Sequence, residues 1–332
     1  MFSLALAIKL SIRKLLIISG PTASGKTALA VKIAKKFNSE LISADSRQIY
    51  KYLDIGVGKD HPKGFPIHLI DLIEPNQKFS VSQFRKLALE KISEIQAKNK
   101  LPILVGGSGF YIDAVINPRY NTFFIKPNFV LRKILFRLPV SLLQLFLKIV
   151  DKKTLLKLNN SDFNNPIRLV RKIEIKLSTP QAPLFQGGVS EGRGGFDVLH
   201  LSLTAPRQYL YDRIDARVES RLKQGHIKEL KSLLKKYKWS DPGLKISAYI
   251  TLKLYIKHLV ETHDRASLQK IKDKCLQKWK YAEHRDARRQ LTWFKKYTHG
   301  FFIDITNPNY QKEVFKTVNK FLIKNYLRYN QS

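Results

Sequence analysis

Three shortages limit what this protein can be: it has one cysteine, few acidic residues and no long apolar run. The lone Cys275 excludes an internal disulfide bond and a cysteine-rich metal site. No apolar stretch reaches the roughly 18 residues that a membrane-spanning helix needs. The apolar segment 1–18 is interrupted by basic residues and lacks a small-residue cleavage site, so we expect a short leader and a first strand, not a signal peptide. We therefore expect a cytosolic protein that stays outside the membrane.

The shortage of acidic residues is the strongest bias in the composition. Lysine and arginine total 60 residues against 26 aspartates and glutamates, which gives a formal net charge of +34. Such a charge does not specify a fold, but it predicts an anionic partner, most simply a nucleic acid. A basic protein at a membrane surface is the alternative. The 332 residues can form one large α/β domain or two smaller domains.

The most specific pattern is a glycine-rich loop between an expected strand and an expected helix. Residues 15–18 form a leucine- and isoleucine-rich run typical of a buried strand, and residues 28–34 fit a helix. A chance match is possible in any glycine-rich turn, but this flanking strand and helix are the context that a phosphate-binding loop requires. The complete G-x-x-x-x-G-K-[ST] pattern reads Gly20, Pro21, Thr22, Ala23, Ser24, Gly25, Lys26 and Thr27.

The residue types of this loop suit a bound phosphate chain. Glycines let backbone N–H groups turn toward a phosphate, and the N-terminus of the following helix adds positive potential. Lys26 can reach the outer phosphate, and the hydroxyl of Thr27 can ligate Mg²⁺. The loop predicts binding of a diphosphate or a triphosphate, without indicating which.

Two more strand ends are expected beside this loop. Residues 39–44 should form a strand that leads into Asp45. Residues 101–105 should form a buried strand that leads into the glycine-rich segment 106–111. Ligands of parallel α/β sheets bind beyond the carboxyl ends of the strands, so we expect Asp45 to face the same crevice as the phosphate loop. Asp45 could instead serve only as the N-cap of a following helix.

The alternation of strands and helices predicts an α/β fold, a P-loop NTPase-like parallel sheet flanked by helices. The alternation stops near Asn117, and only one further strand follows, so we also expect a helical insertion and a helical C-terminal part. The last core strand is expected over residues 196–203. The expected domains are residues 1–119 for the first part of the core, 120–160 for the helical insertion, 161–204 for the remainder of the core, and 205–332 for the helical, basic C-terminal part.

Basic residues recur along the expected C-terminal helices. Arg213, Arg217 and Arg221 are spaced four residues apart along one stripe of a helix. Between residues 278 and 297, arginines and lysines alternate with tryptophan and tyrosine, a mixture that suits phosphate contacts and base stacking. A solvated helix face is the ordinary alternative for such a charged run.

Five segments together resemble the tRNA dimethylallyltransferase family, and the resemblance covers about residues 15–297. It implies transfer of a dimethylallyl group from its diphosphate to the exocyclic amine of the adenosine on the 3′ side of the anticodon in tRNA. Two alternatives stay open: an adenylate isopentenyltransferase that acts on free nucleotides, and a P-loop nucleotide kinase or binder that uses ATP. The segments are GPTASGKT, ISADSRQIYKYLDIG, HLIDLIEP, PILVGGSGFYI and RRQLTWFK.

The resemblance also implies roles for single residues. Asp45, at the crevice, would be the base that deprotonates the acceptor amine, and Arg217, or alternatively Arg213, would bind the diphosphate that the loop and Mg²⁺ hold. The implied partners are tRNA and dimethylallyl diphosphate, bound by a monomer. At residues 247–250 the chain lacks the glycine and the basic residue that the family usually has. The residues expected to contact tRNA or its adenosine are Asp45, Ser46, Arg47, Gln48, Ser108, Arg132, Arg168, Arg171, Arg288 and Arg289.

Overall fold

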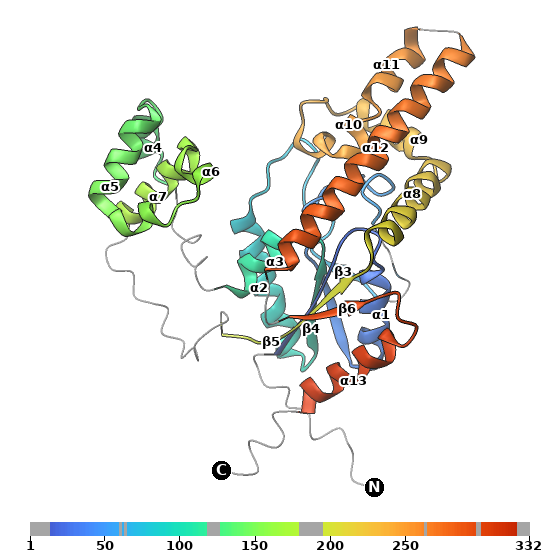
Figure 1. Cartoon of the computed structure of the whole chain (residues 1–332), viewed down its shortest axis with the longest axis horizontal. Coiled ribbons are helices and arrows are strands. Elements are labelled where there is room, and N and C mark those ends of the chain that lie inside the picture. Colours follow the sequence, from blue (N-terminus) through green and yellow to red (C-terminus); the bar gives the residue numbers. More distant parts are fainter. Residues whose placement is uncertain are drawn as a thin grey trace. The chain divides into compact units, whose positions relative to one another are not determined.

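The computed structural model describes residues 14–59, 62, 65–117, 127–178, 195–261, 264–296 and 300–323 (Figure 1). The chain divides into two compact units. The larger unit combines Met1–Ile116 with Arg193–Ser332, and the smaller unit is Asn117–Gly192. In the described part of the chain, no helix is long and apolar enough to cross a membrane.

A six-stranded sheet forms the centre of the larger unit, and all its pairings are parallel. Two strands are buried along their whole length: the one that precedes the phosphate loop and the one that precedes the second glycine-rich segment. Such burial is expected for a parallel sheet that is covered on both faces. The parallel α/β prediction is therefore confirmed. In spatial order the strands are β3 (Ile67–His68), β2 (Ser39–Ser43), β4 (Leu101–Gly106), β1 (Lys14–Ser19), β5 (Asp197–Thr204) and β6 (Phe301–Asp304).

Helices cover both faces of this sheet. On one face, α1 (Lys26–Lys36) and α13 (Tyr310–Ile323) pack against the strands. On the other, α2 (Val81–Ala97) and α3 (Gly109–Ile116) do so. Ser80 caps the N-terminus of α2 with a capping box.

The remaining helices of the larger unit form a third apolar cluster with the segment that follows β2. The long helix α12 contacts α8, α10 and α11, and its C-terminal end reaches α3, which packs against the sheet (Figure 1). These elements are α8 (Arg207–Lys223), α9 (His226–Leu234), the short 3₁₀ helix Pro242–Lys245, α10 (Ser247–Ile250), α11 (Lys253–Glu261) and α12 (Arg265–Phe294).

The prediction that β5 is the last core strand is wrong, because β6 pairs with it at the edge of the sheet. The sequence did not indicate β6 because this strand has only four residues, three of them exposed, and therefore no buried apolar run. The same strand interrupts the C-terminal part, which was expected to be mostly helical. Its neighbour α13 is tied to β1, where the Lys14 ammonium donates to the carbonyl of Leu322 at 3.1 Å.

The smaller unit is helical and has a core of its own. It contains α4 (Phe129–Leu135), α5 (Val140–Leu156), α6 (Asn160–Phe163) and α7 (Pro166–Ser178). The predicted insertion, residues 120–160, ends too early, because the unit extends to Gly192 and includes α7. The physical reason is packing: α7 buries Leu169 and Ile173 in one cluster with Leu143 and Leu147 of α5.

Candidate active site

A cleft of about 1300 Å³ lies at the carboxyl ends of β1, β2 and β4. The phosphate loop and the segment after β2 contribute to its lining, so the structure brings Asp45 and the loop to one crevice as the strand order predicted. The predicted site residues that line it are Thr22, Ala23, Gly25, Lys26, Thr27, Asp45, Ser46, Arg47, Gln48, Ser108, Arg213, Arg217 and Arg289.

The phosphate loop has the backbone that its glycines permit. Gly20 and Gly25 have φ angles of 149° and 81°, in the region that favours glycine. A Cβ atom on Gly20 would lie 2.8 Å from the carbonyl oxygen of Leu203 on β5, so this residue must also be small. Lys26 begins α1 and its ammonium donates to the carbonyl of Pro21 at 2.6 Å, within the loop itself. The loop, its lysine and the N-terminus of α1 form a cradle for an anion.

Two arginines of α8 lie against this cradle. The guanidinium of Arg213 donates to the carbonyl of Ala23 at 2.8 Å. That of Arg217 donates to the hydroxyl of Thr22 at 3.2 Å and to the carbonyl of Gly58 at 3.1 Å. Both candidates for the diphosphate-binding arginine are therefore at the loop.

A third arginine of the same helix, Arg221, is buried behind them. It donates to the carbonyls of Gly56 and Val57 at 3.2 Å each. Burial, and then the positive charge of Arg217, lower its pKa to about 10. A Cβ atom on Gly58, whose φ is +63°, would lie 2.1 Å from the Arg221 guanidinium, so glycine is needed for this close approach.

Glu229 of α9 holds the segment 54–58 that receives these arginines. Its carboxylate accepts hydrogen bonds from the N–H groups of Asp54, Ile55 and Gly56 at 2.9, 2.6 and 2.9 Å. The hydroxyl of Tyr249 donates to it at 2.7 Å. Tyr249 belongs to the segment 247–250 in which the chain departs from the family pattern, and its ring is fully buried. The altered segment thus still packs and supports the cleft.

Asp45 stands in a turn, and the helix-cap alternative is wrong. Residues 46–49 after it form a turn and not a helix. One oxygen of its carboxylate accepts the N–H of Arg47 at 2.9 Å. Ser108, beyond β4, accepts the N–H of Ser46 at 2.9 Å, so the two strand ends are joined beside the cleft.

Helix α12 contributes cleft residues that were not among the predicted site residues. Glu283, Asp286, Gln290 and Trp293 all line the cleft, and their spacing of three or four residues places them on one face of the helix. Gln290 accepts the N–H of Thr22 at 2.9 Å and donates to the carbonyl of Gly107 at 3.1 Å, and so bridges the two glycine-rich loops. The available signal was the segment RRQLTWFK, which contains Gln290 and Trp293, together with acidic residues on the buried stripe of a basic helix.

Four other predicted RNA-contacting residues are paired with residues of their own unit. Arg132 and Arg171 belong to the smaller unit and pair with the buried Glu174 at 2.7 and 2.5 Å. Arg168 belongs to the same unit and pairs with Asp162. Arg288, on α12, donates to the hydroxyl of Tyr211 at 3.0 Å. Their roles stay predictions.

The parallel sheet, the anion cradle at the end of β1 and the carboxylate at the end of β2 define a P-loop-like α/β protein. The family model described as IPP transferase matches residues 48–297, and the chain belongs to this family. The tRNA dimethylallyltransferase of Carboxydothermus hydrogenoformans is 34% identical over 322 residues, covering 95% of this chain and 99% of that protein. The protein of the same name from Finegoldia magna is 35% identical over 292 residues, covering 85% and 88%.

Solved structures agree with this assignment. The full-length tRNA isopentenylpyrophosphate transferase of Bacillus halodurans is 30% identical, with a TM-score of 0.67 over 96% of this chain and 99% of that one. A eukaryotic dimethylallyltransferase acting on tRNA has a TM-score of 0.77 at 23% identity, covering 94% and 80%, and supports the fold.

Proposed function

We propose that the protein transfers a dimethylallyl group from dimethylallyl diphosphate to the exocyclic amine of the adenosine 3′-adjacent to the anticodon in tRNA, and releases diphosphate. The observation that carries this proposal is the cleft itself. It joins a phosphate cradle with two arginines to a carboxylate at the end of β2. The close relatives named as tRNA dimethylallyltransferases support the same activity.

The donor's diphosphate fits the cradle formed by the loop, Lys26, Arg213 and Arg217. As the C–O bond of the allylic carbon breaks, negative charge develops on the leaving diphosphate. Fixed positive groups stabilise that charge most, so these three side chains lower the barrier in addition to binding the donor. Arg217 is held by the loop and by Gly58 together, which orients its guanidinium before the donor binds.

The acceptor amine needs a base, and Asp45 fits this role. The nitrogen forms a bond to the allylic carbon, the carbon–oxygen bond to the diphosphate breaks, and the proton of the amine passes to the Asp45 carboxylate. Within the described part of the chain, this carboxylate accepts one hydrogen bond, from the N–H of Arg47, so its second oxygen remains for the substrate. The adenine must leave the anticodon stack to reach the cleft, as in other base-modifying enzymes.

Mg²⁺ would fit this site as a partner of the substrate. The described residues contain no group of three or more histidine, cysteine or acidic side chains placed to hold a metal. Thr27 places one hydroxyl in the cleft beside the loop. This suits Mg²⁺, which keeps several waters and takes further oxygens from the phosphates of its substrate. When bound, it would neutralise charge on the diphosphate, and Thr27 would hold it.

The exposed face of α12 is proposed to bind the tRNA backbone. Arg285, Arg288, Arg289 and Lys295 are exposed there, and the opposite face of the helix is buried. Cationic side chains of this kind supply most of the salt-dependent affinity for nucleic acids. We further propose that the protein acts as a monomer in the cytosol.

The test is transfer to tRNA by the wild type and by Asp45→Asn. Mass spectrometry of nucleosides after incubation with total tRNA and dimethylallyl diphosphate should show the modified adenosine for the wild type. Asparagine keeps the bond to the N–H of Arg47 but cannot take a proton, so single-turnover transfer should slow by about 10²–10⁴-fold with both substrates still bound. A rate within about threefold of wild type would remove Asp45 from the chemistry. Stronger thermal stabilisation by ATP than by dimethylallyl diphosphate would favour the kinase alternative.

A further inference from the structure

Two buried carboxylates in the cleft do not suit the anions that the cleft is proposed to bind. Glu283 is 3% exposed and Asp286 is 5% exposed, and both line the cleft. Fixed negative charge repels a diphosphate and an RNA backbone, more strongly where water is excluded. Burying a carboxylate also costs free energy unless it is paired. These residues must therefore serve something other than direct substrate binding.

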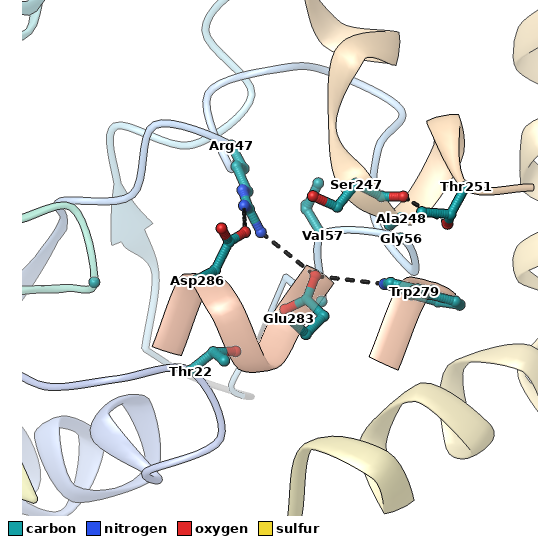
Figure 2. A network of polar contacts seen from close by, with 12 residues as sticks. Thr22, Arg47, Gly56, Val57, Ser247, Ala248, Thr251, Trp279, Glu283 and Asp286 are labelled. Carbon is teal, nitrogen blue, oxygen red and sulfur yellow. Dashed lines mark hydrogen bonds and ion pairs between the residues drawn. The ribbon is translucent and has the colours of Figure 1, made fainter. Parts of the chain in front are cut away.

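Their partner is Arg47, in the turn that follows β2 (Figure 2). One guanidinium nitrogen of Arg47 lies 3.4 Å from Glu283, and the other pairs with Asp286. Each carboxylate has a second partner on α12. The indole N–H of Trp279 donates to Glu283 at 3.4 Å (Figure 2). Arg289 pairs with Asp286.

The charge of the half-buried Arg47 is balanced by the carboxylates around it. Burial alone would lower its pKa, but the carboxylates of Glu283, Asp286 and Asp45 raise it above its usual value. The guanidinium is therefore charged under all ordinary conditions and is already engaged by two carboxylates. It joins α12 to the turn at the cleft wall.

The backbone of the same residue contacts Asp45. The N–H of Arg47 donates to the Asp45 carboxylate at 2.9 Å. Fixing the Arg47 side chain on α12 consequently fixes the amide that orients Asp45. We propose that Glu283 and Asp286 are positioning residues for the transfer reaction: they hold Arg47 against α12 and so keep the turn in the conformation that presents Asp45 to the acceptor amine. This inference rests on the proposed function.

The experiment compares Glu283→Gln and Asp286→Asn with the wild type in single-turnover transfer and in equilibrium binding of donor and tRNA. We expect the rate to fall by about 10- to 100-fold, the loss typical of a misplaced catalytic group. Both dissociation constants should stay unchanged or become smaller, because each variant removes negative charge from an anion-binding cleft. Weaker binding at an unchanged rate would overturn the proposal, since it would make these residues substrate ligands.

Glu219→Gln is the matched control. Glu219, on α8, is likewise ion-paired across to another element, through Lys280 of α12 at 2.7 Å. Its side chain is 58% exposed, however, and it does not line the cleft. The same acid-to-amide change there should leave the rate within about twofold of wild type. A general effect of loosening α12 would instead slow this variant as well, and would overturn the assignment to Glu283 and Asp286.

A double-mutant cycle with Arg47→Gln separates positioning from a structural contribution. If Glu283 acts through Arg47, Glu283→Gln should add no further loss of rate in the Arg47→Gln background, and multiplied losses would refute the proposal. Unfolding midpoints are measured for every variant, and rates are taken below the lowest of them. Should Glu283→Gln alone not fold, the transfer rate of the double variant is compared with that of Arg47→Gln, and the two rates should be equal. An inactive wild type would refute the proposed function, whereas an active wild type with an equally active Glu283→Gln refutes this inference alone.

Discussion

Replacing Glu229 by glutamine should loosen the segment 54–58, on which the arginines of the cleft rest. The carboxylate accepts three backbone N–H groups and a tyrosine hydroxyl, and its side chain is 10% exposed. A glutamine keeps the shape and one acceptor oxygen, but it loses the charge that strengthens these bonds. Because Arg217 and Arg221 donate to carbonyls of Gly56–Gly58, the variant should also bind the donor more weakly.

The pKa of Glu229 sets the size of the effect. Burial raises this pKa, but the nearby His226 and the hydrogen bonds from the backbone and Tyr249 outweigh burial and lower it from 4.5 to about 2. A pKa difference of one unit corresponds to about 1.4 kcal/mol, so the ionised carboxylate contributes about 3 kcal/mol to the free energy of unfolding. The contribution is complete above the unfolded pKa and is lost as the pH falls through about 2.

Urea unfolding followed by tryptophan fluorescence tests this prediction, because Trp239, Trp279 and Trp293 all lie in the larger unit. At pH 7, Glu229→Gln should be less stable by about 3 kcal/mol. The difference should narrow by about 1 kcal/mol between pH 7 and pH 4, since the wild type loses part of its advantage there. Glu90→Gln, at a carboxylate with a 52% exposed side chain on α2, is the control and should change little. A difference below about 1 kcal/mol at pH 7, or one that does not change with pH, would refute the reasoning.

Two further predictions concern ligand binding. Lys26→Ala should weaken donor binding by about 2–3 kcal/mol in calorimetry with Mg²⁺ present, because a charge-assisted contact to the diphosphate is lost, and near-normal affinity would mean that the loop is only structural. Reversing Arg288 and Lys295 to glutamate should weaken tRNA binding for all sequences and reduce the slope of log affinity against log salt by about two, and an unchanged slope would leave these residues as a solvated face.

The part of the fold that could be predicted depends on short stretches of sequence. The phosphate loop needs eight consecutive residues between a strand and a helix, and the strand order then places Asp45 near it. The stripe Arg213, Arg217 and Arg221 follows from the period of one helix, which is why it could be found without a structure. The site residues within these stretches do meet at one cleft.

The rest depends on contacts between distant segments. Arg47 lies 236 residues from Glu283 along the chain, and no local pattern indicates that an arginine on one side of a cleft meets acids on another. The boundary of the smaller unit was missed for a similar reason. Helix α7 belongs to this unit because its apolar stripe packs against α5. The sequence shows that such a stripe is buried, but not which element it packs against.

The rarity of acidic residues makes the position of each buried one informative. Of the four buried acidic residues in the described part of the chain, Glu174, Glu283 and Asp286 each pair with two arginines or help to hold one. In a protein of formal charge +34, arginines brought together in or beside an anion-binding cleft repel one another until an anion arrives. Internal carboxylates relieve this repulsion for arginines with a structural task, such as Arg47. Arg213 and Arg217, whose hydrogen bonds go to hydroxyl and carbonyl oxygens, retain their charge for the substrate. Pairing with two buried carboxylates thus distinguishes Arg47 from Arg213 and Arg217, the arginines proposed to bind the diphosphate.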